Sequence, residues 1–235
     1  MDHTVRTFDA DLSELARKVV QMGRSVKQQI ENATAAVRRH DAALAEQVAA
    51  ADSGVDAQQR EIEGLAVTII ARRQPVAVDL RELVGVMRMA GDLERIGDYA
   101  KNVAKRVAAL NNNFRIDAVM PQLELMVQQV LHQLDSVLES YERRDVNKAL
   151  EVWRRDQDID ALNSSLFRTL LTHMMEDPRS ISSCTHLLFC AKHIERIGDH
   201  ITNIAEAIYY IVEGHEVEEE RPKADTISKD MVRSA

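Results

Sequence analysis

The sequence predicts an all-α protein built from two tandem antiparallel three-helix bundles, and three observations lead to that fold class. The chain of 235 residues has only eight glycines, four prolines and 4% aromatic residues, a composition that favours long helices over strands and their turns. Apolar residues recur at steps of three and four along most of the chain, as one face of a helix requires. The word ERIGD occurs twice, at 94–98 and at 195–199, which indicates an internal duplication.

The first half is predicted to hold three helices. The first covers about residues 8–38, where the apolar residues follow helical spacing. The second covers about 41–73 and ends before Pro75, because proline restricts the residue that precedes it. The third begins at a capping box formed by Asp79 and Glu82 and carries the first ERIGD.

The second half repeats this order. A fourth helix starts near Pro121, a residue that suits a first helical turn. A fifth is capped by Asp145 and runs as one helix until Pro178 ends it. A sixth is capped by Ser180, carries the second ERIGD and ends near Gly214. Three amphipathic helices with short connections pack most simply as an antiparallel bundle, so each half is predicted to form one.

The domain boundaries follow from breaks in composition. Three consecutive asparagines at 111–113 interrupt the helical pattern, so the first repeat is expected at 1–113 and the second at 114–214. Residues 215–235 are charged and nearly lack large apolar side chains, so this tail is expected to be disordered.

Composition argues against several classes of protein. A net charge of −8 without a basic stripe disfavours nucleic-acid binding. No apolar run approaches the roughly 18 residues of a membrane span, and the first ten residues lack an apolar signal core, so we expect a cytoplasmic protein. Cys184 and Cys190 point about 120° apart on one helix and are expected to be buried free thiols.

No pattern of catalytic residues stands out. The sequence lacks HExxH, a P-loop, GxSxG and the ExxH ligand pair of ferritin-like centres. His186, His193 and His200 form a stripe at seven-residue spacing, but they point to the flank opposite the acidic residues of ERIGD and are expected to be surface or helix-packing residues. We therefore expect a protein that is not an enzyme.

The repeated word carries the candidate site. Each copy places carboxylates at its first and fifth positions, and an asparagine follows four residues later. These six residues are Glu94, Asp98 and Asn102 in the first half and Glu195, Asp199 and Asn203 in the second. At about 100° per residue they lie roughly 150° from the apolar seam that contains Ile96 and Ile197, so they are predicted to face outward.

Two hypotheses explain this acidic strip. Carboxylates four apart on a helix repel one another, and a bound metal ion would offset the repulsion, since hard cations take oxygen ligands. Alternatively the strip is a solvated face neutralised by neighbours such as Arg95 and Arg196. Exact repetition of the pattern adds weight to the metal hypothesis and leaves both hypotheses open.

A further acidic pair extends the second site. Asp156 and Asp160 lie on the fifth helix beside its apolar seam, where they could approach the sixth helix. Matching the helix breaks places Gln59 and Glu63 at their counterparts in the first half, a weaker ligand set. The second site is therefore expected to bind metal better than the first.

The glycine of the word has a packing role. Gly97 and Gly198 lie between the acidic strip and the apolar seam, where a missing side chain would let an adjacent helix come close. Glycine inside a helix destabilises it by up to about 1 kcal/mol relative to alanine, so its occurrence at both equivalent positions favours this role.

The residues around these words resemble the PhoU family of bacterial phosphate-transport accessory and regulatory proteins. The matching stretches cover about residues 5–215 and include QMGRSVKQQIENA, RQPVAVDLRELV, DLERIGDYAKNVA, HMMEDPRS and LFCAKHIERIGDHITNIAEAIYYIVEG. The resemblance implies pseudo-twofold symmetry between the bundles and no catalytic activity. It also implies a negative regulator that couples the phosphate ABC transporter at the inner membrane to a sensor histidine kinase, restraining both when phosphate is plentiful.

The resemblance carries further expectations about ligands and partners. It implies metal ions, either multinuclear iron or zinc or else manganese or magnesium, at E(D)xxxD motifs that fall here on Glu94 and Asp98, on Asp156 and Asp160, and on Glu195 and Asp199. The expected partners are the transporter's cytoplasmic ATPase subunit and the kinase. Arg95 and Arg196 are expected to bind partners, with neither residue assigned to one of the two. A homodimer is also expected. The alternatives are a metal-dependent enzyme, a metal-storage protein and a purely structural helical scaffold.

Overall fold

The computed structural model describes residues 2–110, 118–219 and 221, leaving out the side chains of 2–7, and all the regular structure in these residues is helical. The predicted all-α class is confirmed. The elements in order are α1 (Asp2–Arg39), α2 (Ala42–Arg73), α3 (Val78–Lys105), the 3-10 turn η1 (Arg106–Ala109), α4 (Met120–Arg143), α5 (Val146–Arg154), α6 (Asp156–Glu176), the 3-10 turn η3 (Pro178–Ser180) and α7 (Ile181–Glu213).

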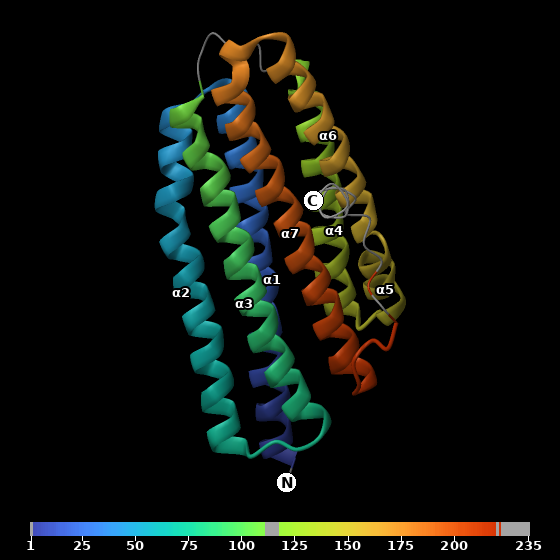
Figure 1. The fold of residues 1–235 in the computed structure, drawn as a ribbon. Coiled ribbons are helices and arrows are strands. Elements are labelled where there is room, and N and C mark those ends of the chain that lie inside the picture. The colour runs from blue at the N-terminus through green and yellow to red at the C-terminus, as the bar shows by residue number, and fades with distance from the viewer. Residues whose placement is uncertain (1, 111–117, 220, 222–235) are drawn as a thin grey trace.

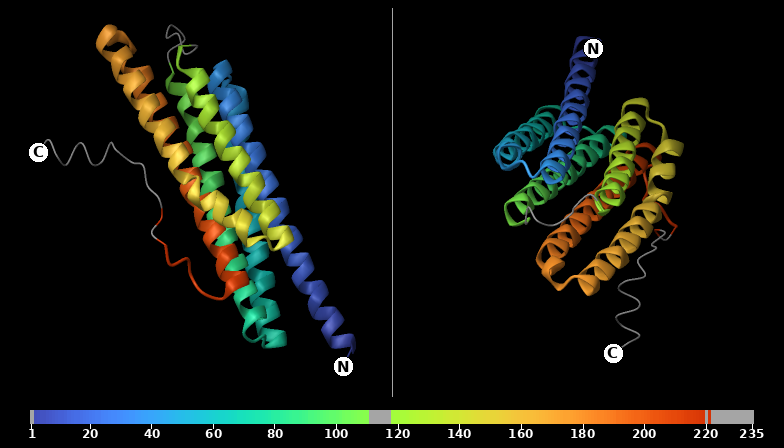
Figure 2. Two further views of the ribbon diagram at one scale, coloured as in Figure 1. Left: turned by 90° about the vertical axis from the view of Figure 1, so that its right-hand side faces the viewer. Right: turned by 90° about the horizontal axis from the view of Figure 1, so that it is seen from above.

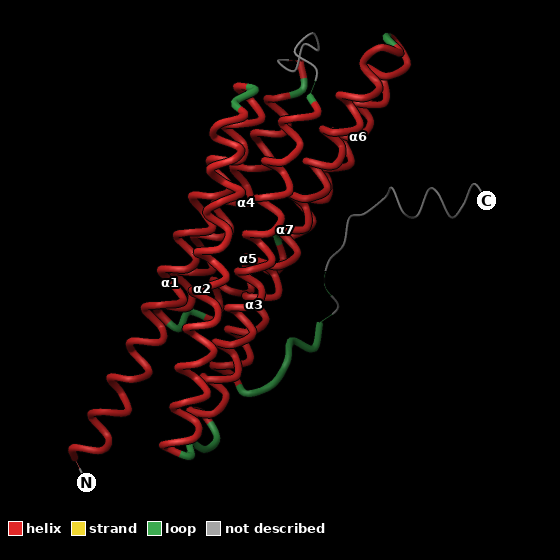
Figure 3. The backbone as a smooth tube through the Cα atoms, turned by 90° about the vertical axis from the view of Figure 1, so that its left-hand side faces the viewer, coloured by secondary structure: helices red, strands yellow, loops and turns green. Residues whose placement is uncertain are grey.

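The helices form the two predicted bundles. Helices α1, α2 and α3 pack on one another, as do α4, the α5/α6 pair and α7. Helices α3 and α7 run antiparallel and side by side in the middle of the molecule and join the bundles (Figure 1). The view from above shows the bundles next to each other (Figure 2). Loops are confined to the helix ends and to the segment that follows α7 (Figure 3).

Two of the predicted helix caps are correct and two are not. Asp41 and Asp145 accept hydrogen bonds from the backbone N–H groups of Leu44 and Lys148, at 2.9 and 3.1 Å. The capping box at 79–82 is wrong, because α3 begins after Ala77 and Glu82 is buried against the second bundle. Ser180 precedes α7, but its hydroxyl donates to carbonyl groups of the preceding turn instead of capping the helix.

The predicted fifth helix is divided in two at Arg155. This residue adopts φ −87° and ψ 4°, so the helix is interrupted there. Its carbonyl accepts hydrogen bonds from the backbone N–H of Asp158 and from Nε2 of Gln133, both at 3.1 Å. The interruption places Asp156 at the start of α6.

The two bundles share one apolar core to which all the α-helices contribute. Ile96 and Ile197 are 0% and 1% exposed, so the predicted seam positions are confirmed. A buried polar contact also ties the bundles together: the Tyr141 hydroxyl on α4 donates to Oε1 of Glu82 at 2.8 Å, and Arg144 pairs with the other oxygen of that carboxylate.

Two sequence-based expectations concern residues outside the described part of the chain. The repeat boundary after residue 113 lies outside the described part of the chain, as does most of the tail expected to be disordered, at 220 and 222–235. None of the helices that the structure describes combines the length and the apolar character that crossing a membrane would require.

Candidate functional site

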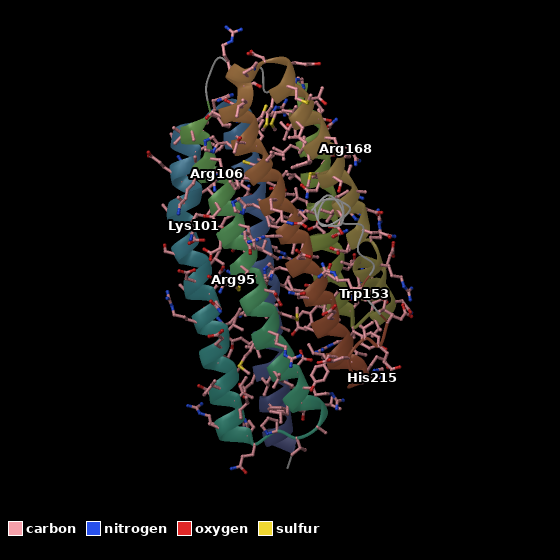
Figure 4. The ribbon with its side chains drawn as sticks, viewed as in Figure 1. Arg95, Lys101, Arg106, Trp153, Arg168 and His215 are labelled. Atoms are coloured by element: carbon pink, nitrogen blue, oxygen red, sulfur yellow. The ribbon has the colours of Figure 1, made fainter. Side chains whose placement is uncertain are left out.

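The acidic residues of the first ERIGD meet an acidic pair on α2, and we call these four residues the first acidic cluster. Its members are Asp52, Asp56, Glu94 and Asp98. Nζ of Lys101, one turn further along α3, lies 2.5 Å from Asp52 Oδ2 and 2.6 Å from Asp98 Oδ1. Lys101 and Arg95 are marked on α3 in Figure 4. The chain therefore supplies a cation to this cluster from the same helix that carries ERIGD.

The charges of the first cluster act on one another. Burial alone would lower the pKa of Lys101, but the hydrogen bonds and negative charges of Asp52 and Asp98 outweigh it and raise that pKa. Burial raises the pKa of Glu94, and the nearby charge of Asp98 raises it further. The raised pKa values of Lys101 and Glu94 both reflect several carboxylates lying close together around the Lys101 ammonium group.

The second ERIGD forms the second acidic cluster, with α6 taking the place of α2. Its members are Asp156, Asp160, Glu195 and Asp199. Here the cation comes from beyond α7: Arg221 Nη2 lies 2.9 Å from Asp156 Oδ1 and 2.8 Å from Asp199 Oδ1, and its Nε donates to Asp156 Oδ2 at 3.0 Å.

One carboxylate of the second cluster is incompletely paired. Glu195 is 8% exposed; its Oε1 accepts from Lys192 at 2.8 Å, while its Oε2 is buried without a hydrogen-bond partner. Burial raises the pKa of Glu195, and the charges of Asp199 and Asp160 add to that effect. A buried acceptor that lacks a donor costs free energy, so this oxygen would gain from a bound cation.

The pairing of the two halves differs from the predicted one. Asp52 and Asp56 lie 104 residues before Asp156 and Asp160 and occupy the equivalent place against α3, whereas Gln59 donates to Glu63 on its own helix at 3.0 Å. The assignment of Gln59 and Glu63 as counterparts of the α6 pair is therefore wrong. The acidic i, i+4 spacing of Asp52 and Asp56 was the signal that could have identified them. Each cluster holds four carboxylates, so a weaker ligand set does not distinguish the first.

The predicted outward orientation of the acidic strip is also wrong. Side chains of Glu94 and Asp98 are only 22% and 28% exposed, Glu195 is buried, and Asp199 is 37% exposed. The reason is that α2 covers this flank of α3 and α6 covers the same flank of α7. The carboxylates lie in interhelical seams, where their mutual repulsion is less screened by water than on an open surface.

Asn203 bonds to a residue outside its acidic cluster. Nδ2 of Asn203 donates to Asp92 Oδ1 at 3.1 Å, and the same oxygen lies 2.8 Å from His200 Nδ1. Asn203 thus belongs to the interface between α3 and α7. Asn102 is half-buried on α3.

Two of the three histidines of the stripe, His193 and His200, pack between the bundles, as expected for helix-packing residues. Tyr99 stacks on His193 with ring centroids 5.7 Å apart and lies 5.6 Å from the ring of His200. Asp92 and Tyr99 occupy the same positions in the first repeat as His193 and His200 in the second, 101 residues apart. The two contacts, Asp92 with His200 and Tyr99 with His193, are therefore crossed pairs at the centre of the α3 and α7 interface.

The two arginines of ERIGD remain accessible. Arg95 is 62% exposed and lies 3.7 Å from Glu94 and 3.8 Å from Asp98. Arg196 is exposed, with its guanidinium 5.8 Å from the centroid of the Tyr99 ring. A groove of about 640 Å³ runs between α3 and α7 beside Arg95. Contact of these arginines with partners stays a prediction.

The two glycines of the word permit the predicted close approach. A Cβ at Gly198 would lie 2.8 Å from Cδ1 of Ile159 on α6, and a Cβ at Gly97 would lie 3.0 Å from Oε1 of Gln29 on α1. Because Gly198 has no side chain, α6 lies close enough to α7 for Asp156 and Asp199 to contact the same guanidinium, that of Arg221.

The clusters have the ligand chemistry of a hard metal site, but the structure shows them closed around cations of the chain. Carboxylate oxygens suit magnesium, manganese, iron and zinc. Among the described residues, no three His, Cys, Asp or Glu side chains converge closely enough to hold a metal ion. Lys101 and Arg221 occupy the positions between the carboxylates, so a metal would have to replace one of them.

Comparison with known proteins agrees with this architecture. The PhoU domain family model matches residues 19–107 and 123–208, one match in each bundle. The accessory protein PhoU homologue of the phosphate-specific transport system of Rhizobium meliloti is 47% identical over 226 residues, covering 96% of this chain and 95% of that protein. The corresponding protein of Caulobacter vibrioides is 43% identical over 228 residues, covering 97% and 99%.

Solved structures show the same fold. The crystal structure of PhoU from Pseudomonas aeruginosa superposes with a TM-score of 0.83 at 36% identity, covering 88% of this chain and all of that one. The phosphate transport system regulatory protein PhoU from Streptococcus pneumoniae gives 0.84 at 29% identity, covering 90% of this chain and all of that one. The pseudo-twofold arrangement and the expected lack of catalytic activity are both consistent with these regulatory and accessory proteins. The chain, with its two matched repeats and near full-length relatives, belongs to the PhoU family of phosphate-transport accessory proteins.

Proposed function

We propose that this protein is a negative regulator that couples phosphate uptake to phosphate-starvation gene expression. In this proposal it works in the cytoplasm, docks on the ATPase subunit of a phosphate ABC transporter and on a sensor histidine kinase, and restrains both when phosphate is plentiful. The observation that carries the proposal is the 47% identity, over 96% of the chain, to a phosphate-specific transport system accessory protein. The protein reaches the membrane only through these partners.

The exposed residues of α3 and α7 offer a docking surface for such partners. Arg95 and Arg196 come from the two copies of one word and are both exposed, and Arg95 lines the groove between the bundles. Arginine makes planar, multidentate contacts with carboxylates and is enriched at protein interfaces. A homodimer would present each of these surfaces twice.

Deletion of the gene tests the regulatory role. Loss of the protein should switch on a phosphate-starvation reporter in phosphate-rich medium, and the double variant Arg95→Ala plus Arg196→Ala should do the same while keeping its melting temperature. Arg179→Ala, an exposed arginine at the α6 to α7 turn, serves as the matched control and should leave the reporter silent. A reporter that stays silent in the deletion strain contradicts the proposal.

We also propose that the second acidic cluster binds a divalent or multinuclear metal, with iron, zinc, manganese and magnesium as candidates. The supporting observation is the buried, unpaired Oε2 of Glu195 beside the carboxylates of Asp160 and Asp199. Glu195, Asp199, Asp156 and Asp160 would supply the oxygen ligands, and the metal would neutralise their charge. Binding would require Arg221 to leave and these carboxylates to draw together, because no three of the described His, Cys, Asp or Glu side chains already converge on one point. Both clusters hold a cation of the chain, but the first is the poorer site, because its cation, Lys101, is carried by α3 itself, whereas Arg221 reaches the second cluster from the chain beyond α7.

Metal analysis of the purified protein tests this part. Asp156→Asn plus Asp199→Asn keeps the side-chain volumes but removes two anionic ligands, so it should abolish bound metal. Asp52→Asn plus Asp98→Asn makes the same change in the first cluster and should leave bound metal nearly unchanged. Equal metal content in all three proteins would refute the assignment to the second cluster.

A further inference from the structure

The chain that follows α7 folds back over the second bundle. Gly214 ends α7 with a left-handed backbone, φ 85°, and the chain then reverses beside α7 and α5. Val217 packs against the core, the His215 ring lies edge-on to Tyr209 at 5.4 Å, and Glu219 lies 3.9 Å from Arg154. This path leads to Arg221, whose side chain is 17% exposed between α6 and α7.

Arg221 is held more tightly than a surface arginine. Three contacts of 2.8 to 3.0 Å join its guanidinium to Asp156 and Asp199, and both oxygens of Asp156 take part. Burial alone would lower the pKa of Arg221, but the hydrogen bonds to Asp156 and the negative charges of Asp156, Asp199 and Glu206 outweigh burial and raise that pKa. Multidentate, charge-assisted contacts of this kind are among the strongest hydrogen bonds in proteins.

The two repeats differ at the residue that decides where this cation comes from. Lys101 enters the first cluster from α3, and the equivalent residue of α7, 101 positions later, is Thr202. The Thr202 hydroxyl donates to the Gly198 carbonyl at 3.1 Å and lies 3.3 Å from Asp156, but it brings no charge. The second cluster therefore lacks a cation on its own helix at this position, and Arg221 arrives from beyond the residues that match the family model, which end at 208.

We propose that Arg221 is a displaceable cationic latch: it fills the second acidic cluster, and a metal ion that binds there releases Arg221 and the segment 215–219 from α5 and α7. This inference rests on the metal site proposed above. A divalent ion and the guanidinium need the same oxygens of Asp156 and Asp199, and two adjacent cations repel each other, so the two states exclude one another. Metal occupancy then determines whether the segment covers this face of the second bundle.

The first cluster has no comparable mechanism. Lys101 is carried by α3 itself, so it cannot leave the first cluster by moving a chain end. Arg221 is the seventh residue after Gly214 and lies outside any helix, so it can leave without any helix moving. The difference between a helical and a loop-borne cation makes only the second cluster switchable.

Competition between Arg221 and the metal ion should appear as a change in metal affinity when Arg221 is removed. Because coupling between two binding events is reciprocal, the factor by which the latch weakens metal binding equals the factor by which metal weakens the latch. Removing the latch should therefore tighten metal binding by about tenfold or more, within the range of about 5 to 150-fold usual for such couplings. Arg221→Lys, which keeps the charge but loses the planar fork, should have an intermediate effect.

The test uses the full-length protein and Zn²⁺ as the probe. Zn²⁺ affinity is measured by calorimetry for the wild type and for Arg221→Ala, with Arg179→Ala as a matched control at an exposed arginine. Segment release is measured by energy transfer from Trp153, the single tryptophan, to a dansyl group on Glu218→Cys. Trp153 is 2% exposed and bonded to Glu206 at 2.9 Å, so it is a fixed donor near the latch. The native thiols, Cys184 and Cys190, are 0% exposed and should not take the label.

The expected result is tighter Zn²⁺ binding in Arg221→Ala, unchanged binding in Arg179→Ala, and a loss of energy transfer as Zn²⁺ saturates the labelled protein. Equal affinity in the wild type and Arg221→Ala, with energy transfer that Zn²⁺ leaves unchanged, would overturn the latch while the metal site stands. Absence of any Zn²⁺ binding that depends on Asp156 and Asp199 would instead overturn the metal site and, with it, release by metal. The two failures are thus distinguishable.

Discussion

Replacing Gly198 by alanine tests whether the glycine of the repeated word sets the distance between α6 and α7. The added Cβ would lie 2.8 Å from Cδ1 of Ile159, which is 1% exposed in the core. Ordinary contacts between carbon atoms are about 3.5 to 4.0 Å, so Ile159 has to move or α6 has to shift away from α7. Either response strains the seam that holds the second acidic cluster.

The expected size comes from two opposing effects. Overpacking a well-filled core destabilises proteins by about 1 to 3 kcal/mol. Alanine is a better helix former than glycine, so the same substitution stabilises the helix by about 1 kcal/mol. The net loss should therefore reach up to about 2 kcal/mol in the free energy of unfolding. Gly64 on α2 provides the matched control, because a Cβ there meets no atom within 4 Å, and Gly64→Ala should stabilise the protein by about 0.5 to 1 kcal/mol.

Urea unfolding followed by far-ultraviolet circular dichroism measures both variants. A difference of about 1 to 3 kcal/mol between them corresponds to several degrees in melting temperature for a chain of this length. Ile159→Val removes Cδ1, the atom in conflict, so in that background Gly198→Ala should become as favourable as Gly64→Ala. The reasoning is refuted if Gly198→Ala stabilises the wild type as much as Gly64→Ala does, or if Ile159→Val does not relieve its effect.

Three further predictions follow from buried polar groups. Glu82→Ala leaves the buried Tyr141 hydroxyl without its acceptor, so the free energy of unfolding measured by chemical denaturation should fall by about 2 kcal/mol. Glu82→Gln keeps an acceptor oxygen and should lose less. Equal losses in the two variants would contradict this account. Burial, with Arg106 and Arg196, lowers the pKa of His193 from 6.5 to about 4. The unfolded chain therefore binds a proton that the folded protein resists, and stability should fall as the pH drops from 6.5 through about 4, with a flatter profile in His193→Gln. Burial raises the pKa of Cys190 to about 12, so iodoacetamide should modify this thiol only after unfolding, as mass spectrometry of native and denatured samples would show.

Much of the fold was predictable because it depends on neighbours in the sequence. Helix starts at Asp41 and Asp145 follow from side chains that bond to N–H groups three residues away. The buried seam at Ile96 and Ile197 follows from helical periodicity. Repetition of a five-residue word predicted the duplication, which the family matches in both halves confirm.

The failed predictions depend on how helices meet. Periodicity gives the angle between Glu195 and the apolar seam, but it does not say that α6 covers that flank, so Glu195 was expected in solvent and is buried. Matching helix ends does not give the register of α2 against α3, so it predicts Gln59 at the place beside the first ERIGD that Asp52 occupies. No proline or glycine marks the break at Arg155 in the sequence. Its carbonyl instead accepts a hydrogen bond from Gln133 of another helix, a contact that local spacing does not predict.

The sequence by itself therefore determined the helical class, the two repeats and the acidic residues that the repeats share, because these are properties of local spacing and composition. Only the tertiary structure decided that the carboxylates lie in interhelical seams, which acidic pair faces which copy of ERIGD, and that the cations Lys101 and Arg221 fill the two clusters. The physical reason is that charge pairing across a seam depends on register and on where a chain end returns, and neither is encoded in the periodicity of a single helix.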